Sequence, residues 1–415
     1  MSVSHSKSIA PVLKLLHIVT SANPVSGGPI EGVKQLGAVN SRAGHSIDVA
    51  CLTDPGAEVQ ANFPLKLHSF KKSYLSYCYC PEAVDWLRKN RDSYDAVIVN
   101  GMWQYNAVVA WRGLKGGKVP YFIYPHGMLD PWFARAYPLK HLKKYLYWWF
   151  LQERVVRGAK ALLFTCEEER RLARKSFSPY RCKEVVVNYG TSNPKGDPAA
   201  QKEKFYQRCP EARGKRMLLF LSRIHEKKGC DMLVNSFAEL LQKSPVGEPW
   251  HLVMAGPDQT GLVPSLKARA ESLGISDRIS WPGMLKDDDK WGAFHACEAF
   301  VLPSHQENFG IAVVEAMACK APVLISKQVN IWREIEEDGA GLVESDDQHG
   351  TNRLLTRWAA LPPERRQRMG ETAQVTFLER FEIHRAASNM IKAIQGGMAL
   401  QDSTRPLPGL IERHS

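Results

Sequence analysis

The stretch AFVLPSHQENFGIAVVEAMACKAPVLIS (residues 299–326) has the pattern of a strand, a loop, a helix and a second strand. The runs 299–304 and 321–326 are apolar and as short as buried strands, and residues 311–318 between them carry apolar side chains at helical spacing. Two strands joined through a helix are the building unit of layered α/β domains. The stretch therefore predicts a parallel sheet covered by helices.

The same alternation continues on both sides of this unit. A chain of 415 residues exceeds what one hydrophobic core normally serves, and the polar stretch NYGTSNPKGDPAAQ (188–201) has the composition of a linker. We expect an α/β protein of two similar domains, residues 1–193 and 194–380, with an amphipathic helix at 381–398 that packs back on the first domain. Sheets of this kind bind ligands at the carboxyl ends of their strands, so two facing sheets would form a central cleft. The expected strands are 12–20, 46–53, 94–101, 121–127, 160–166, 216–222, 250–256, 277–283, 299–304 and 321–326, and helices are expected at about 28–42, 80–90, 104–112 and 138–157.

Composition bounds the class of protein. Hydrophobic residues make up 44% and charged residues 24%, which is typical of a soluble globular protein. No apolar run approaches the roughly 20 residues that span a bilayer, and residues 1–20 lack the pattern of a signal peptide. Nine scattered cysteines favour reduced thiols and no structural metal. We expect a cytoplasmic protein, with the inner face of the plasma membrane as a possible place of peripheral contact.

The formal net charge of +12 has three candidate explanations: nucleic acid, an anionic membrane surface and a phosphate-bearing substrate. The stretch YPLKHLKKYLYWWFLQERVVRGAK (137–160) is helical, basic and aromatic, which suits a membrane interface that presents a lipid-linked glycan. The alternative is a core helix in which Trp148, Trp149 and Phe150 are buried. No nucleic-acid recognition motif stands in its expected context, so nucleic acid is not an expected partner.

A glycine pair follows the first expected strand, in SANPVSGGPIEG (21–32). Gly27 and Gly28 allow the backbone to approach a ligand, and the helix that follows offers free N–H groups to an anion. An ordinary strand-to-helix turn is the alternative. The dinucleotide fingerprint G-x-G-x-x-G is missing from this place, which disfavours hydride transfer.

A pair of cations follows the expected strand at 216–222, in SRIHEKKG (222–229). The guanidinium of Arg223 and the ammonium of Lys228 can neutralise a diphosphate and stabilise the charge that grows on a departing nucleotide. A solvated start of a helix is the alternative, although cations at a helix N-terminus oppose the helix dipole unless an anion joins them.

Two glutamates stand on either side of a helix start in the opening stretch. Glu307 precedes the loop Asn308, Phe309 and Gly310, whose amides would point at a ligand, and Glu315 lies about one turn into the helix, where it can bind a vicinal diol such as a ribose. The alternative is a surface salt bridge between a loop and a helix. A carboxylate amid IAVVEAMA is costly to bury without a partner, which favours the binding role.

Taken together, SRIHEKKG, PSHQENFGIAVVEAMA and PHGMLDPW (125–132) resemble retaining glycosyltransferase family 4, across most of the chain from Gly27 to about Gly341. The resemblance implies the GT-B fold, with two Rossmann-like domains, the first on the acceptor side and the second holding the donor. It implies that Arg223 and Lys228 hold the donor diphosphate. The remaining implied roles are donor-sugar contact by Glu307, Asn308, Phe309 and Gly310, ribose binding by Glu315, closure over the phosphates by Gly27 and Gly28, a place near the base for Gly283, Met284 and Leu285, and a place at the reacting centre for His126.

His126 follows an expected strand, and its expected role is a hydrogen bond to the donor sugar rather than nucleophilic attack. A histidine at a strand end that only makes structural hydrogen bonds is the alternative. Asp287–Asp289 contain a D-x-D pattern, but they stand just before a helical stretch, where carboxylates favour a helix start. We therefore expect capping and no requirement for a divalent metal or other cofactor.

Two positions depart from the family pattern. Lys320 stands where the family usually has glycine before the next strand, which predicts a left-handed residue at a helix C-terminus and little effect on chemistry. The family's Asn-Gly after the last strand of the first domain is Asn188-Tyr189-Gly190 here, which changes the expected geometry of the hinge.

The resemblance implies a hexosyl transfer from a nucleotide diphosphate sugar (GDP- or UDP-hexose) to a glycan or lipid-linked acceptor, with retention at the anomeric carbon, in polysaccharide biosynthesis. No pair of carboxylates is evident that would act as in a retaining hydrolase. Three rivals share features of the sequence: an epimerase or phosphorylase of the same shape, a non-catalytic sugar-binding protein, and a nucleic-acid-binding protein.

Overall fold

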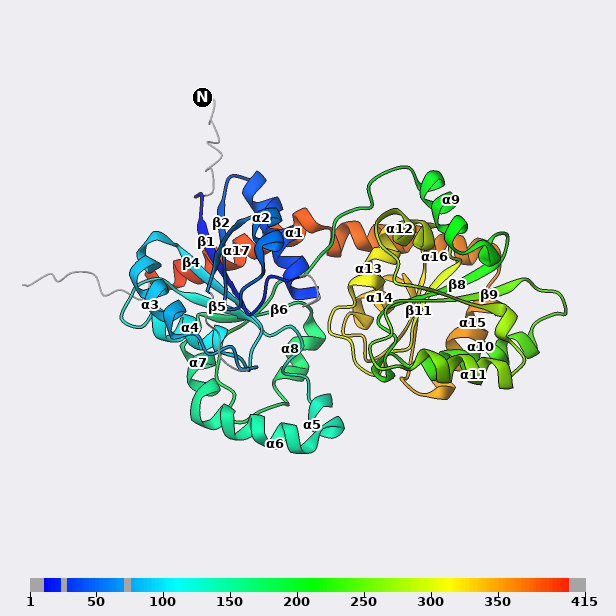
Figure 1. The fold of residues 1–415 in the computed structure, drawn as a ribbon, viewed down its shortest axis with the longest axis horizontal. Helices are drawn as coiled ribbons and strands as arrows, with labels where there is room; N and C mark the ends of the chain where they lie inside the picture. Colours follow the sequence, from blue (N-terminus) through cyan, green and yellow to red (C-terminus); the bar gives the residue numbers. More distant parts are fainter. Residues whose placement is uncertain (1–10, 24–27, 71–75, 403–415) are drawn as a thin grey trace, which may run out of the picture. The chain divides into compact units, whose positions relative to one another are not determined.

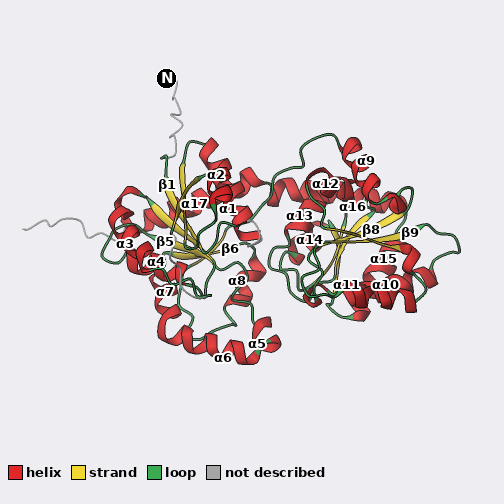
Figure 2. Cartoon of the chain, in the orientation of Figure 1, coloured by secondary structure: helices red, strands yellow, loops and turns green. Residues whose placement is uncertain are grey.

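The computed structural model describes residues 11–23, 28–70 and 76–402. The chain folds into two compact units (Figure 1). Unit 1 comprises residues 1–164, 173–187 and 387–415, and unit 2 comprises residues 165–172 and 188–386. Each unit is a parallel sheet covered by helices (Figure 2). The prediction of an α/β protein built from two Rossmann-like domains is confirmed.

Within the described residues, unit 1 has a seven-stranded parallel sheet of order β3-β2-β1-β4-β5-β6-β7. Its central strands read as nearly continuous apolar runs because helices cover them; all five residues of β4, AVIVN, are buried. The strands are β1 (Lys14–Val19), β2 (Ser46–Cys51), β3 (Lys66–Ser69), β4 (Ala96–Asn100), β5 (Tyr121–Tyr124), β6 (Ala161–Phe164) and β7 (Glu184–Val186), and the helices are α1 (Gly28–Arg42), α2 (Ala57–Asn62), α3 (Pro81–Asn90), α4 (Tyr105–Gly113), α5 (Trp132–Ala136), α6 (Pro138–Tyr147) and α7 (Glu153–Gly158). Helix α8 (Glu167–Ala173) follows β6 in the chain and belongs to unit 2 apart from its last residue.

Unit 2 has a six-stranded parallel sheet of order β10-β9-β8-β11-β12-β13 in the described part of the chain. Strand β9, WHLVMA, is buried over its whole length. The strands are β8 (Arg216–Leu221), β9 (Trp250–Ala255), β10 (Ile279–Gly283), β11 (Ala299–Leu302), β12 (Val323–Ser326) and β13 (Gly341–Glu344), and the helices are α9 (Pro198–Arg208), α10 (Cys230–Lys243), α11 (Val263–Ser272), α12 (Asp287–Ala296), α13 (Ile311–Ala318), α14 (Trp332–Asp338), α15 (Gln348–Ala360), α16 (Pro363–Thr376) and α17 (Ile383–Asp402).

The borders of the two units differ from the expected 193/194 and 380/381. The division falls between Val187 and Asn188, and helix α17 passes from unit 2 to unit 1 between Ala386 and Ala387. Part of the expected linker is held by a backbone hydrogen bond, in which the Thr191 N–H donates to the carbonyl of Phe381 over 3.1 Å. Gly190 makes this approach possible, since a Cβ there would lie 2.5 Å from the same carbonyl oxygen. In the segment Asn188-Tyr189-Gly190, which differs from the family pattern, the glycine is therefore required because the backbone of Phe381 passes close to it.

The C-terminal helix has its last turns on unit 1. A Cβ on Gly397 would lie 2.8 Å from the Phe122 ring of β5, and the Gln395 amide donates to the carbonyl of Pro11 over 3.4 Å. In the described residues, no helix is both long enough and apolar enough to cross a membrane.

The expected helix at 138–157 is interrupted. Helix α6 is followed by a π-helical segment, Trp148–Gln152, and then by α7. Trp148 is buried, whereas Trp149 and Phe150 are exposed, so the alternative of a core helix that buries all three side chains is wrong.

Candidate active site

The order of strands in unit 2 reverses between β8 and β11, which are hydrogen-bonded neighbours. In an open α/β sheet, the crevice outside the carboxyl ends of the strands at such a reversal is the usual place for a ligand. The loop after β8 carries Arg223 and Lys228, and the loop after β11 carries Glu307. The sheet therefore brings these two loops to one edge.

Lys228 and Glu307 meet at this edge. The Lys228 Nζ lies 2.5 Å from the Glu307 Oε2, and the Lys228 side chain is only 5% exposed. An ammonium buried to this degree requires a partner of opposite charge, and Glu307 supplies it. Arg223 stays exposed, and its guanidinium donates to the side-chain oxygen of Gln259 over 3.1 Å.

Gly229 fixes the position of Lys228. It has φ 66° before α10, and a Cβ there would lie 2.3 Å from the carbonyl oxygen of Pro303 in the loop after β11. Only glycine fits at this contact. The loops after β8 and β11 are therefore locked together, with Lys228 one residue before the contact.

The loop that starts at Glu307 is held by its own backbone and by neighbouring side chains. The Glu307 N–H donates to the carbonyl of Gln328, and the Asn330 N–H donates back to the carbonyl of Glu307 over 3.0 Å. The Asn308 side chain donates to the Thr165 hydroxyl over 3.1 Å and accepts from the Asn330 amide over 3.3 Å. A loop anchored in this way can present its amides in a fixed direction.

Gly310 starts helix α13 in a left-handed conformation, with φ 71°. Phe309 before it is buried, and its ring lies 5.5 Å from the ring of Tyr189 and 5.7 Å from the ring of Phe381. Phe309 therefore anchors the loop through its side chain, and the first N–H groups of the helix remain the groups available to a ligand.

Glu315 lies in α13 and is 7% exposed. Its Oε1 is 2.7 Å from the Nζ of Lys290 in α12. The salt-bridge alternative is therefore met in part: Glu315 does engage a cation, but its carboxylate is buried rather than at the surface, and its binding role stays a prediction. Sequence reasoning missed Lys290; the apolar setting of Glu315 indicated that a partner was needed, but not which residue supplies it.

The segment at the end of β10 contains the residues expected near the base. Gly283 closes the strand with φ 72°, and its carbonyl accepts from the Gly256 N–H over 2.8 Å. Leu285 is buried, whereas Met284 is 55% exposed. Of these three residues, Met284 presents an apolar side chain to the surroundings.

Asp287–Asp289 form the first turn of α12, as expected, and no side-chain cap is formed by the residue that precedes them. Asp288 instead accepts from Gln201 over 3.1 Å and from Lys204 over 2.8 Å, both in α9. Its carboxylate thus ties two helices together rather than capping one. Among the described residues, no group of three or more His, Cys, Asp or Glu is placed to hold a metal ion.

In unit 1 the strand order reverses between β1 and β4, and His126 follows β5. The His126 Nε2 lies 3.3 Å from the Oδ1 of Asn100, and the Asn100 amide lies 3.2 Å from the Nδ1 of His17. Burial lowers the pKa of His126 to about 4, with the nearby His17 as a second cause. The imidazole is therefore neutral at neutral pH. It stands on a strained backbone, with φ 50°.

The glycine pair is described only in part. Gly28 is the first residue of α1, and no atom lies within 4 Å of where its Cβ would be. Gly27 lies outside the described residues. The expected role of the pair stays a prediction.

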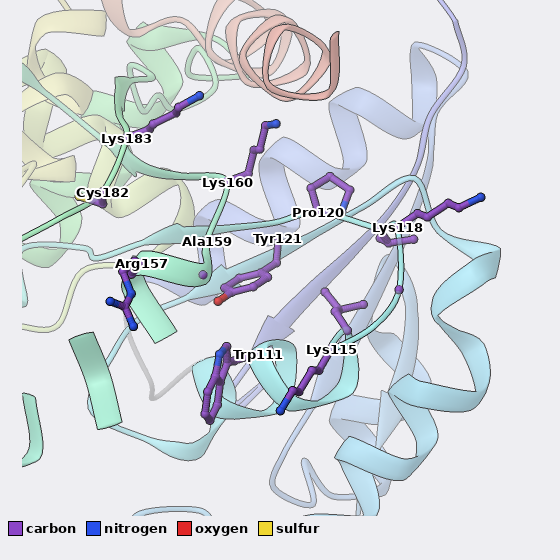
Figure 3. Close-up of a pocket in the computed structure, with 14 residues that line it drawn as sticks. Trp111, Lys115, Lys118, Pro120, Tyr121, Arg157, Ala159, Lys160, Cys182 and Lys183 are labelled. Carbon is purple, nitrogen blue, oxygen red and sulfur yellow. The ribbon is translucent and has the colours of Figure 1, made fainter. Parts of the chain in front are cut away.

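A hollow of unit 1 lies at a different edge of its sheet. A pocket of about 670 Å³ lies at the amino ends of β5 and β6 (Figure 3). Its lining includes Lys115, Arg157, Lys160 and Lys183 and no carboxylate. Since the candidate site residues follow the carboxyl ends of strands, this pocket is not part of the candidate active site.

Comparison with known proteins identifies the family. The model of "Glycosyl transferases group 1" matches residues 201–376, and the model of "Glycosyl transferase 4-like domain" matches residues 27–190. The first match spans most of unit 2 and the second most of unit 1. Fold and site thus define a two-domain α/β protein of the GT-B type. The chain belongs to the group 1 glycosyltransferases of family 4.

Individual relatives are more distant. Mannosylfructose-phosphate synthase of Agrobacterium fabrum is 32% identical over 124 residues, which cover 29% of this chain and 27% of that protein. D-inositol 3-phosphate glycosyltransferase of Kineococcus radiotolerans is 28% identical over 241 residues, or 54% of each chain. The chain thus spans about half the length, or less, of these curated relatives. The solved structure of HepE of Anabaena in complex with UDP and glucose has a TM-score of 0.71 and 16% identity, and the match covers 92% of this chain and 100% of that one.

Proposed function

We propose that this protein is a retaining, metal-independent glycosyltransferase that transfers a hexosyl unit from a nucleotide diphosphate sugar to a glycan or lipid-linked acceptor in polysaccharide biosynthesis. One observation carries the proposal: Lys228 and Glu307 lie in contact at the carboxyl ends of β8 and β11, beside the start of α13. A cation, a carboxylate and a helix N-terminus are the groups that a diphosphate-linked sugar requires.

The donor is proposed to bind unit 2. Arg223 and Lys228 would hold the diphosphate, Glu307 and the amides up to Gly310 would contact the sugar, and Glu315 would bind the ribose. HepE, which shares the fold, has been solved with UDP and glucose, which supports a UDP-sugar as the first donor to test. Leu285 and its neighbours at the end of β10 are proposed to lie near the base.

In the proposed reaction, the bond between the anomeric carbon and the phosphate oxygen breaks, and a bond from the acceptor oxygen to that carbon forms on the same face. The acceptor's proton passes to the departing phosphate oxygen, so the products are the nucleoside diphosphate and the glycoside. Arg223 and Lys228 stabilise the negative charge that develops on the leaving group. His126, neutral at neutral pH, is assigned a hydrogen bond to the sugar.

A screen of nucleotide sugars tests this function, with release of nucleoside diphosphate as the readout, in the presence and absence of EDTA. Arg223→Gln and Lys228→Gln should lower kcat more than they raise KM for the donor, because the charge they stabilise is largest in the transition state. Lys267→Gln, which removes an exposed cation from α11, is the matched control and should leave both constants unchanged. An unchanged kcat in both site variants would refute the assigned role.

The products distinguish the transferase from its rivals. An epimerase would convert the sugar without transfer to an acceptor, and a phosphorylase would release a sugar phosphate. Loss of activity in EDTA would overturn metal independence while leaving transfer intact. Inversion at the anomeric carbon, measured by NMR of the first product formed, would overturn retention.

A further inference from the structure

Helix α6 and the π-helical segment after it expose an apolar face. Leu139 is 78% exposed, Leu142 60%, Leu146 56%, Trp149 64% and Phe150 71%. Steps of three, four, three and one residue place these side chains on one side of a helix. Figure 1 shows α6 at the margin of unit 1, away from the strands of its sheet. Large exposed side chains grouped in this way indicate an interaction surface rather than chance exposure.

The opposite face of the same helix is already packed. Trp148 is fully buried, its indole N–H donates to the carbonyl of Pro179 over 3.0 Å, and its ring stacks on Phe177 with centroids 5.1 Å apart. Lys144 points to this inner side, where its ammonium lies 4.9 Å from the centroid of the Trp103 ring. The helix therefore packs on unit 1 through its inner face, and its outer apolar side chains do not belong to that hydrophobic core.

The charges around the outer face have one sign. Residues 131–152 contain no Asp or Glu, and they contain Arg135, Lys140, Lys143 and Lys144. Arg135, Lys140 and Lys143 are exposed. An apolar stripe bordered by cations matches the two layers of an anionic lipid surface, in which acyl chains lie beneath negative headgroups.

We propose that the outer face of residues 138–152 docks on an anionic lipid bilayer. Leu139, Leu142, Leu146, Trp149 and Phe150 enter the boundary between headgroups and acyl chains, and Lys140 and Lys143 contact the headgroups. The inner face of the plasma membrane is the proposed surface, since that leaflet is anionic. The biological purpose of this contact, access to a lipid-linked acceptor, rests on the proposed function. Binding to lipid can be measured without donor or acceptor.

A second copy of the chain is a poorer occupant of this face. In a symmetric dimer the same patch meets itself, so the lysines of one copy would face those of the other. Residues 131–152 offer no carboxylate to pair with them. Anionic lipid removes this repulsion.

The test is co-sedimentation of the full chain with vesicles of phosphatidylcholine and phosphatidylglycerol in equal parts, and with vesicles of phosphatidylcholine alone. The face variant is Leu142→Ser/Leu146→Ser/Phe150→Ser, and the charge variant is Lys140→Gln/Lys143→Gln. Two controls remove exposed side chains of the same kind from unit 2: Val246→Ser/Val375→Ser for apolar side chains and Lys215→Gln/Lys267→Gln for lysines. Lys144 is left intact because it is only partly exposed and its ammonium lies over the Trp103 ring on the inner side.

The wild-type protein and both controls should sediment with the anionic vesicles. The charge variant should bind the anionic vesicles roughly 30-fold more weakly, at slightly more than fivefold for each lysine near an anionic surface. The face variant should lose binding to the anionic vesicles. Circular dichroism and nucleotide-sugar hydrolysis of the variants should match the wild type, which separates this test from failure of the proposed function. Wild-type protein that stays in the supernatant would overturn the proposal. So would a wild-type dimer that the face variant converts to monomer without any lipid binding.

Discussion

Lys320→Gly is the substitution whose effect the backbone defines most sharply. Helix α13 ends at Ala318, and Lys320 two residues later has φ 61°. The Ala321 N–H donates to the carbonyl of Ala316 and the Lys320 N–H to the carbonyl of Met317, each over 3.0 Å. This pair of hydrogen bonds is the Schellman motif, in which glycine normally occupies the left-handed position. The structure thus confirms the left-handed lysine that the sequence predicts.

The magnitude follows from three contributions. A side chain in the left-handed conformation costs roughly 1–2 kcal/mol, and glycine avoids this cost but loses about 0.5–1 kcal/mol more in chain entropy. Removing a cation from a helix C-terminus costs about 0.3–1 kcal/mol. Lys320→Ala removes the charge but keeps the strained Cβ. The glycine variant should therefore be more stable than the alanine variant by about 0.75 kcal/mol and close to the wild type.

Urea unfolding of the full chain, followed by tryptophan fluorescence, measures these differences. The backbone should not relax in either variant, because the carbonyl of Lys320 lies against Gly370 of α16, where a Cβ would come within 2.5 Å of it. The Lys320 side chain is exposed, so little packing is lost. Equal unfolding midpoints for the glycine and alanine variants would refute the reasoning. Donor turnover should be the same in all three proteins.

Three further substitutions have defined outcomes. Lys290→Met should lower the free energy of unfolding by about 3 kcal/mol because it removes the ammonium from the buried Glu315 carboxylate. The double variant Lys290→Met/Glu315→Gln should lose less stability in urea unfolding, because no unpaired carboxylate remains. An equal or larger loss in the double variant would contradict this explanation. Gly229→Ala should lower the free energy of unfolding by more than about 2 kcal/mol, because residue 229 has φ 66° and the new Cβ would lie 2.3 Å from the Pro303 carbonyl oxygen. It should also reduce donor turnover. Normal turnover in the folded variant would contradict the close packing of the loops after β8 and β11. Burial lowers the pKa of His17 to about 4, so the unfolded chain binds a proton below about pH 6.5 that the native protein does not. Wild-type stability should fall by about 1.6 kcal/mol between pH 6.5 and pH 5 on its account. His17→Leu should make the pH dependence of stability shallower without abolishing it, because His126 has its pKa lowered in the same way. Equal slopes would show that His17 does not titrate as described.

Elements with a strong apolar pattern were predictable. The expected helix at 28–42 has the same bounds as α1, and the expected strands that flank the β8 and β11 loops are present within two residues. The strands that the sequence did not predict are β3, β7 and β13. Strand β3, KLHS, lies at the edge of its sheet and has no fully buried residue, so it lacks an apolar pattern to detect. Such strands form because a neighbouring strand offers its hydrogen-bonding edge, which is a tertiary effect.

The positions of candidate site residues could be predicted where chemistry and strand position coincide, and their roles stay predictions. Lys228 and Glu307 lie in the loops that follow β8 and β11, and Glu315 lies inside helix α13. Their partners were harder to find. Lys290 is 25 residues from Glu315 and meets it only because α12 and α13 pack together. His17 sits inside an apolar strand, 83 residues from Asn100, with nothing local to mark its contact. Sequence pattern identifies the residue that needs a partner, and tertiary packing decides which residue that is.

The two carboxylates of the candidate site each engage a cation, and this bears on how a diphosphate would be recognised. Glu307 contacts Lys228, and Glu315 contacts Lys290, so in the described structure both ammonium groups are neutralised by neighbours. Arg223 is exposed and donates to the neutral side-chain amide of Gln259, so its full charge is presented at the strand edge. In the proposed function, Arg223 therefore provides the first attraction, which acts through solvent and weakens with salt. In the same proposal, Lys228 would engage the phosphates after its carboxylate partner turns to the sugar, since exchanging one anion for another costs a buried ammonium far less free energy than transfer out of water. Salt should accordingly weaken donor binding less in Arg223→Gln than in the wild type, and an equal salt dependence would contradict this order of engagement.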